Sequence, residues 1–209
     1  MNIAIVGTGR VAAALGKGWA KKGHVITFAS RNPNEPKVLD LVAEIGANGS
    51  ATRIEDAISR SSIVVLAVPF SAAEELLHQA GNLQDKVLVD CTNPIAPGLR
   101  SLFDSSTSGA DQIAGWAPGA KVVKAFNTTG AENMANPVYN GQPTMMPICG
   151  NDALAKAAVW QLAEDLGFEP VDAGTLSAAR HLESLALLWI HLANLGQLGR
   201  DIAFRLLRR

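Results

Sequence analysis

The chain has 209 residues, enough for one domain or for a domain with a small appendage. Hydrophobic residues make up 48% of it, and the formal net charge is −1. This balance is typical of a globular α/β protein and gives it no electrostatic reason to bind nucleic acid or a membrane surface. Two cysteines, Cys91 and Cys149, do not make a disulfide framework. We therefore expect a cytoplasmic protein with reduced thiols.

The chain enters an apolar run at residue 2, which leaves no room for a signal peptide. Its most apolar stretch, residues 185–195, is too short to span a bilayer and includes His191 and Asn194. The four histidines are scattered and do not have metal-ligand spacing. We expect no membrane segment and no metal site.

The first thirty-one residues carry the strongest pattern. Residues 2–6 are a short β-branched run, which predicts a buried strand. A glycine turn and a helical pattern that ends at Gly23 follow, and residues 25–29 predict a second strand. Strand, glycine turn, helix and strand together form the context in which a G-x-G-x-x-A match indicates dinucleotide binding.

The spacing within the turn has a chemical reason. Gly7 permits the tight turn, Gly9 lets a pyrophosphate approach the backbone, and Ala12 lets the helix pack closely on the sheet. Free N–H groups and the positive end of the helix dipole then face the phosphates. The predicted pyrophosphate-binding residues are Gly7, Thr8, Gly9, Arg10 and Val11. The alternative is an ordinary βαβ unit with a glycine-rich corner.

The residues after the second strand indicate which dinucleotide binds. NAD-binding folds place Asp or Glu there to accept a hydrogen bond from the ribose 2′-hydroxyl. This chain has Ser30, Arg31 and Asn32 instead. A guanidinium and a hydroxyl suit a 2′-phosphate, which a carboxylate would repel. We therefore expect NADP, the alternative being a solvated arginine in a turn.

Strand and helix patterns alternate along most of the remaining chain. Predicted strands cover residues 51–52, 62–68, 86–90, 121–126, 144–149 and 169–173, and predicted helices cover 37–45, 54–59, 72–80, 111–116 and 153–166. Asp152 is the expected cap of the last of these helices. Residues 101–109 predict a loop and residues 131–141 an irregular segment. The alternation predicts a Rossmann-type, doubly wound and mostly parallel sheet.

Ligands of such sheets bind beyond the carboxyl ends of the strands. There we expect Val68, Pro69 and Phe70 to cover the adenosine or pyrophosphate. Asn93, followed by Pro94, is placed to bond the nicotinamide ribose or carboxamide. Each proline could equally be a simple strand terminator.

Residues 176–209 follow this predicted NADP-binding domain of residues 1–175. They carry apolar residues on nearly all faces of a predicted helix. Because a small domain cannot enclose such a helix, we expect this C-terminal helical tail to pack on the domain and on a second subunit of a homodimer. A polar stripe on the tail either faces the cofactor or lies in a helix–helix interface; it comprises Ser177, His181, Ser184 and His191.

Several stretches resemble the coenzyme F420-dependent NADP oxidoreductase family, which has related domains in the cytosolic part of membrane metalloreductases. The matching stretches are residues 7–12, 23–26, 30–33, 121–128, 147–152 and 172–185, the last of them the most particular. The resemblance covers essentially the whole chain and implies NADP held by residues 8–11 and by Ser30 and Arg31. It also implies that a deazaflavin ring lies on the nicotinamide.

The chain departs from F420-using members after the sixth strand. Those members have a histidine-containing stretch there, whereas this chain has Phe126, Asn127 and Thr128, closer to the flavin-using metalloreductase type. These three residues are the expected acceptor-binding residues. The expected acceptor is F420 or a flavin.

Hydride transfer between two flat rings needs little acid–base machinery, so we predict no catalytic side chain. The expected function is an NADPH-dependent oxidoreductase whose partner is a small-molecule redox acceptor. The alternatives are a reductase of a small carbonyl or imine compound and a non-catalytic NADP-binding or sensing protein.

Overall fold

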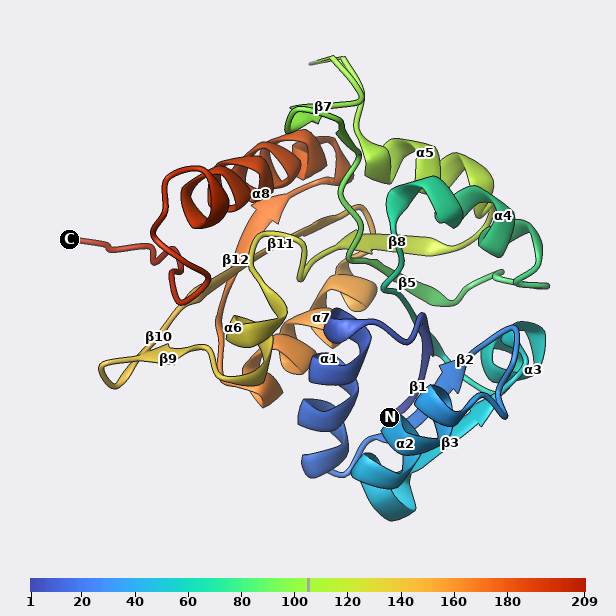
Figure 1. Cartoon of the computed structure of the whole chain (residues 1–209). Helices are drawn as coiled ribbons and strands as arrows, with labels where there is room; N and C mark the ends of the chain where they lie inside the picture. Colours follow the sequence, from blue (N-terminus) through green and yellow to red (C-terminus); the bar gives the residue numbers. More distant parts are fainter. Residues whose placement is uncertain (105) are drawn as a thin grey trace.

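The computed structural model describes residues 1–104 and 106–209; Ser105, within the predicted 101–109 loop, lies outside the described residues. One sheet of eight strands runs through the molecule (Figure 1). Its strands are β1 Asn2–Val6, β2 Val25–Ala29, β3 Gly49–Thr52, β4 Ile63–Leu66, β5 Val87–Asp90, β8 Lys121–Lys124, β11 Met145–Gly150 and β12 Glu169–Gly174. The helices are α1 Arg10–Lys21, α2 Pro36–Ile45, α3 Ile54–Ser59, α4 Ala73–His78, α5 Gly109–Trp116, α6 Ala131–Ala135, α7 Ala153–Leu166 and α8 Ala179–Asn194.

The strand order is β12-β11-β8-β5-β4-β1-β2-β3. From β3 to β8 all neighbouring strands are parallel, while β11 pairs antiparallel with β8 and parallel with β12. The order reverses between β1 and β4, which is the point where doubly wound sheets bind ligands. The predicted Rossmann-type, mostly parallel fold is confirmed.

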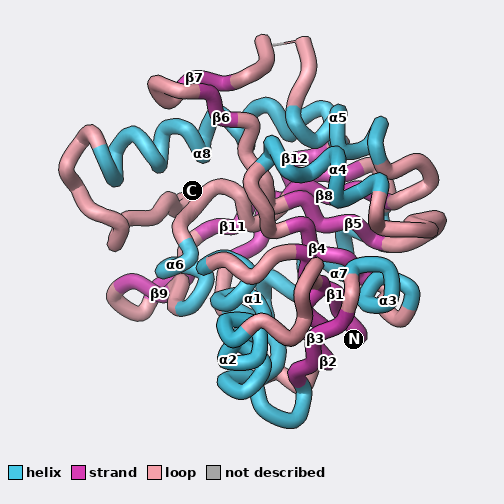
Figure 2. The backbone as a smooth tube through the Cα atoms, turned by 45° about the vertical axis from the view of Figure 1, so that its right-hand side comes forward, coloured by secondary structure: helices cyan, strands magenta, loops and turns pink. Residues whose placement is uncertain are grey.

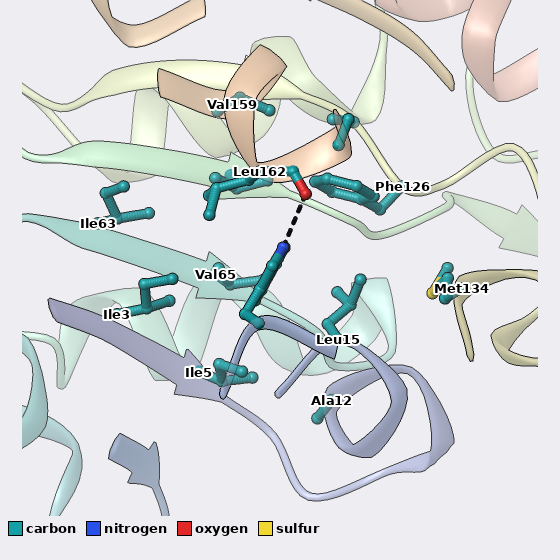
Figure 3. Packing of buried hydrophobic residues seen from close by; sticks show 14 of the residues in the cluster. Ile3, Ile5, Ala12, Leu15, Ile63, Val65, Phe126, Met134, Val159 and Leu162 are labelled. Atoms are coloured by element: carbon teal, nitrogen blue, oxygen red, sulfur yellow. Dashed lines mark hydrogen bonds between the residues drawn. The ribbon is translucent and has the colours of Figure 1, made fainter. Parts of the chain in front are cut away.

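Helices cover both faces of the sheet (Figure 2). One core cluster joins the sheet to α1, α2 and α7, and the other joins it to α3, α4, α5 and the start of α8. The first core is centred on Trp19, whose indole N–H donates to the Leu162 carbonyl over 2.9 Å. Figure 3 shows Leu15 and Leu162 with other members of this cluster. These layers leave the carboxyl ends of the parallel strands as the common edge for loops.

The segment predicted to be irregular, residues 131–141, is more ordered than expected. It forms α6 and then the first strand of a hairpin, β9 Val138–Tyr139 paired with β10 Gln142–Pro143. The prediction was wrong because both elements are too short to show a periodic pattern. A second hairpin, β6 Ile95–Ala96 with β7 Arg100–Ser101, follows β5.

The C-terminal tail is helical only in its first half. A 3₁₀ turn, η3 Leu176–Ala178, leads into α8, and residues 195–209 form neither helix nor strand. Positive φ angles at Gln197 and Gly199 end the helical path. The chain then returns toward the sheet, where the amide of Met145 donates to the Phe204 carbonyl over 3.0 Å. The prediction of a helical tail is therefore corrected after Asn194.

Among the described residues, no helix combines the length and the apolar character that a bilayer-crossing segment needs.

Candidate functional site

The glycine turn between β1 and α1 requires its first glycine. Gly7 has a φ of +121°, and a Cβ there would lie 2.4 Å from the Ala67 carbonyl oxygen. Gly9 precedes α1 with no side-chain cap, and a Cβ on it would meet nothing within 4 Å. The turn therefore presents bare backbone to open space at a helix N-terminus. This geometry fits a pyrophosphate.

A cleft of about 580 Å³ opens at this turn. It is lined by residues at or after the ends of β1, β2 and β4, by the residue before α2, and by residues in or next to α3 and α4: Val6, Gly7, Thr8, Gly9, Ala29, Ser30, Arg31, Asn32, Glu35, Ile54, Ala67, Val68, Pro69, Ala72 and Leu76. The structure thus brings the predicted glycine turn, the predicted 2′-phosphate residues and two of the three residues predicted after β4 to one place.

The 2′-phosphate candidates lie at the mouth of this cleft. The Arg31 side chain is exposed, and the Ser30 hydroxyl accepts a hydrogen bond from the Asn32 amide over 3.2 Å. Glu35, which precedes α2, also lines the cleft. The sequence analysis missed Glu35 because it lies in a loop beyond the strand end, where no periodic pattern marks it.

Arg10 and Val11 do not line the cleft. The guanidinium of Arg10 pairs with the Glu132 carboxylate on α6, which also accepts from Nε of Arg200 over 2.7 Å. Val11 is half-buried and packs against the first core. The side chains of these two residues are therefore engaged outside this cleft, although they follow the glycine turn directly.

Phe70 and Pro94 lie farther along the same edge and are also absent from the cleft wall. The Phe70 ring contacts Trp116 and Phe103, with ring centroids 5.6 and 5.7 Å apart. Pro94 is buried, and its Cδ and the Phe70 ring each lie 3.1 Å from where a Cβ of Gly109 would stand. Both residues therefore pack the start of α5 in this structure.

The amides of Asn93 and Asn127 form a reciprocal pair at the ends of β5 and β8. Asn93 Nδ2 donates to the main-chain carbonyl of Asn127 over 2.9 Å, and Asn127 Nδ2 donates to the side-chain Oδ1 of Asn93 over 3.0 Å. Within the described part of the chain, the buried Oδ1 of Asn127 has no hydrogen-bond partner. Thr128, which follows, is also buried. Asn93 therefore follows β5, which is next to β4 in the sheet, and Asn127 follows β8, the next strand after β5.

The structure corrects the expectation for Phe126. Its side chain is 1% exposed and lies in the core, where it makes edge contacts with Trp19 and Phe168. Figure 3 shows it with other buried members of that cluster. The backbone of Phe126 has a φ of +59°, so the chain turns sharply after β8 and directs the ring inward. The Phe126 side chain, predicted to bind the acceptor, is therefore part of the core in this structure.

The sequence analysis missed a buried ionic triad. Lys124 and Asp90 are each fully buried, with Nζ 2.8 Å from Asp90 Oδ2, and Lys124 also lies 3.0 Å from Glu183 Oε1. Burial alone lowers the pKa of Lys124, but the charges and hydrogen bonds of the two carboxylates outweigh it and raise that pKa above 10.5. The lysine is therefore a cation at neutral pH, buried beneath the strand ends. The pattern of polar and apolar residues in β8 did not indicate that Lys124 is buried in an ion pair.

Burial raises the pKa of both thiols, that of Cys149 to about 12. Cys91 and Cys149 are free cysteines within the part of the chain that the structure describes. They are protonated at neutral pH and therefore poor nucleophiles.

The polar stripe of α8 divides. His181 and Ser184 line a second cavity, about 450 Å³, whose other side is formed by Ser101, Phe103, Asp104 and Thr107. Ser177 and His191 are exposed and line neither this cavity nor the cleft of the glycine turn. The stripe thus does not face that cleft.

The comparisons with known proteins agree with this geometry. The family model for "NADP oxidoreductase coenzyme F420-dependent" matches residues 2–94. A protein from Arthrobacter sp. FB24, described as a candidate F420-dependent NADP reductase, is 31% identical over the full length of both chains, with a TM-score of 0.89. An imine reductase from Myxococcus stipitatus, solved with NADP⁺, shares the fold at 21% identity and a TM-score of 0.71, covering 95% of this chain and 64% of that one.

Among curated proteins, rat metalloreductase STEAP3 is 30% identical over 186 residues, which is 89% of this chain. Human metalloreductase STEAP2 is 27% identical over 199 residues. The chain spans about a third (36%) of the length of these two relatives. The full-length match and the cleft at the glycine turn point the same way: the chain belongs to the coenzyme F420-dependent NADP oxidoreductase family.

Proposed function

We propose that this NADP-dependent oxidoreductase transfers hydride between NADP(H) and a planar redox cofactor, either F420 or a flavin. The observation that carries the proposal is the single cleft that joins the glycine turn to Ser30 and Arg31. Bound NADPH would supply the hydride. The protein's own part is to hold the dinucleotide, orient the nicotinamide and leave its face open to a second ring.

Each end of the dinucleotide has a proposed set of residues. Gly7, Thr8 and Gly9 hold the pyrophosphate through the backbone, with Arg10 and Val11 contributing their amides. Ser30, Arg31 and Asn32 hold the 2′-phosphate, and Val68 and Pro69 cover the adenosine. The nicotinamide half extends toward Asn93, because neighbouring strands are about 4.8 Å apart and β5 lies next to β4. Asn127 and Thr128 are the proposed acceptor-side residues.

A pair of variants tests the 2′-phosphate assignment. One charge-assisted hydrogen bond is worth roughly 1.5–3 kcal/mol. Arg31→Ala should therefore weaken the affinity for NADPH by about ten- to a hundred-fold and change the affinity for NADH little. Glu35→Gln, in the same cleft, is the matched control. It should keep or improve the preference for NADPH, since a carboxylate repels phosphate. Equal losses of both coenzymes in Arg31→Ala would refute the assignment.

The acceptor is tested by NADPH consumption with F420, FMN and FAD, beside a panel of small imines and carbonyl compounds. Turnover with one of the ring compounds supports the proposal. Turnover confined to imines or carbonyls would replace it with a small-molecule reductase. Tight NADPH binding with no acceptor consumed would indicate a binding or sensing protein.

We also propose a cytoplasmic homodimer formed through the segment from residue 176 to 209. Leu176 and Leu182 belong to the second core, so this segment packs on the domain of residues 1–175. Leu188 on the outer face of α8 is 48% exposed, and Leu195 and Leu198 beyond it are also exposed. Sedimentation of the chain and of Leu188→Glu tests this proposal: a monomer in both would contradict it.

A further inference from the structure

The buried pair of Asp90 and Lys124 sits directly beneath the proposed nicotinamide end of the site. The two residues are partners in the parallel register of β5 and β8, at the last position of each strand. Both are 0% exposed. Replacing a buried ion pair with apolar residues is often neutral or stabilising, so a contribution to stability is weak grounds for such a pair.

The pair holds the backbone that follows β5 from both sides. Asp90 Oδ1 accepts the Thr92 amide over 2.8 Å, and Lys124 Nζ donates to the Thr92 carbonyl over 2.6 Å. Asp90 Oδ2 and Lys124 Nζ are themselves 2.8 Å apart. Both main-chain polar groups of Thr92 are thus fixed by one ion pair. The next residue along the chain is Asn93.

Asn93 is then locked to the neighbouring strand end through the reciprocal amide pair with Asn127. Two buried polar atoms lie in this group without a partner in the described residues, namely Thr92 Oγ1 and Asn127 Oδ1. Buried polar atoms usually find partners, so these two point to a polar ligand group or a water molecule at this place. The carboxamide and ribose of a nicotinamide carry such groups.

We propose that Asp90 and Lys124 are positioning residues that fix Thr92 and Asn93 in the conformation that receives the nicotinamide half of NADP(H). This inference rests on the proposed cofactor site and adds the residues that hold one end of it. Neither side chain touches the coenzyme. Their effect passes through the Thr92 backbone and the Asn93 amide.

Glu183 provides an internal control. It is the second carboxylate paired with Lys124, and it accepts hydrogen bonds from the amides of Gly109 and Ala110 over 3.0 and 3.2 Å. Among its hydrogen bonds and ion pairs, none involves Thr92. Removing either carboxylate of the triad leaves Lys124 with one carboxylate partner and the Thr92 carbonyl, but only the loss of Asp90 releases the Thr92 amide.

The experiment compares Asp90→Leu with Glu183→Met by calorimetry with two probes, NADP⁺ and adenosine 2′,5′-bisphosphate. The second probe carries the adenosine end and no nicotinamide. We expect Asp90→Leu to weaken the affinity for NADP⁺ by about tenfold, which corresponds to the loss of one net hydrogen bond. The affinity for the bisphosphate should change less than about twofold. Glu183→Met should change both probes less than about twofold, whatever its effect on Tm.

A purely structural role would lower Tm in both variants without separating the two probes, and that result would overturn the proposal. If Asp90→Leu does not fold, Asp90→Asn decides the question. It keeps an acceptor for the Thr92 amide but weakens the bond to Lys124, so a smaller separation of the probes is expected, and no separation overturns the proposal. A wild-type chain that binds neither probe would instead refute the proposed cofactor site.

Discussion

The buried triad consists of Lys124, Asp90 and Glu183, and Lys124 is its cation. Replacing Lys124 with methionine removes that charge while keeping a side chain of similar length. Asp90 is fully buried and Glu183 nearly so, and both lose the ammonium group that lies 2.8 and 3.0 Å away. The Thr92 carbonyl also loses its 2.6 Å donor. The variant therefore leaves two buried carboxylates with their main-chain amide donors but without a cation.

The expected cost follows from this burial. Breaking a buried pair by removing one partner typically costs about 3–5 kcal/mol, a large part of a domain's total of about 5–15 kcal/mol. Lys156→Met is the matched control. Its ion pair with Asp172 is as short, at 2.8 Å, but the carboxylate is exposed, so that substitution should cost less than about 1 kcal/mol.

The loss in Lys124→Met should depend on pH. In the wild type the raised pKa of Lys124 means that its contribution is complete below pH 10.5 and is lost as pH rises through the higher folded-state value. The deficit of the variant should therefore be largest below pH 10.5 and shrink as pH rises above that value, because the wild type loses the contribution of the lysine there.

Urea unfolding at several pH values measures both effects. The reasoning fails if Lys124→Met costs no more than Lys156→Met. It also fails if the deficit does not shrink as pH rises above 10.5, since that would mean that the charge of Lys124 is not what stabilises the wild type.

Three further predictions concern local geometry. Gly7→Ala should destabilise the fold and abolish coenzyme binding, because its Cβ would stand 2.4 Å from the Ala67 oxygen at a φ of +121°. Gly9→Ala should fold normally, since its Cβ meets nothing within 4 Å, yet weaken NADP⁺ in a binding titration; unchanged affinity would place the pyrophosphate elsewhere. Asp152 caps α7 through the Ala155 amide at 2.8 Å, and this bond lowers the pKa of Asp152. Its stabilisation is present above about pH 3.8 and is lost as pH falls through the lower folded-state pKa, so the Tm deficit of Asp152→Ala should disappear in acid.

The sequence alone determined the framework of the cofactor-binding half. Val25–Ala29 and Ile54–Ser59 were predicted with the bounds that the structure has, and the glycine turn was placed correctly between β1 and α1. These features follow from hydrophobic period, cap residues and glycine spacing, which act over a few residues. Arg31 and Gly9 could therefore be placed in one cleft, because the parallel topology brings the ends of β1 and β2 together.

Only the tertiary structure determines which side chains meet at the ends of strands that are far apart in the sequence but adjacent in the sheet. The Asp90–Lys124 pair and the Asn93–Asn127 pair join residues 34 positions apart. Phe126 turns into the core because of a positive φ that no periodic pattern announces. A charged residue within a strand normally predicts an exposed face, and only the neighbouring carboxylates make the burial of Lys124 favourable. Local patterns therefore specified the elements, and contacts between distant strands specified how the site is held.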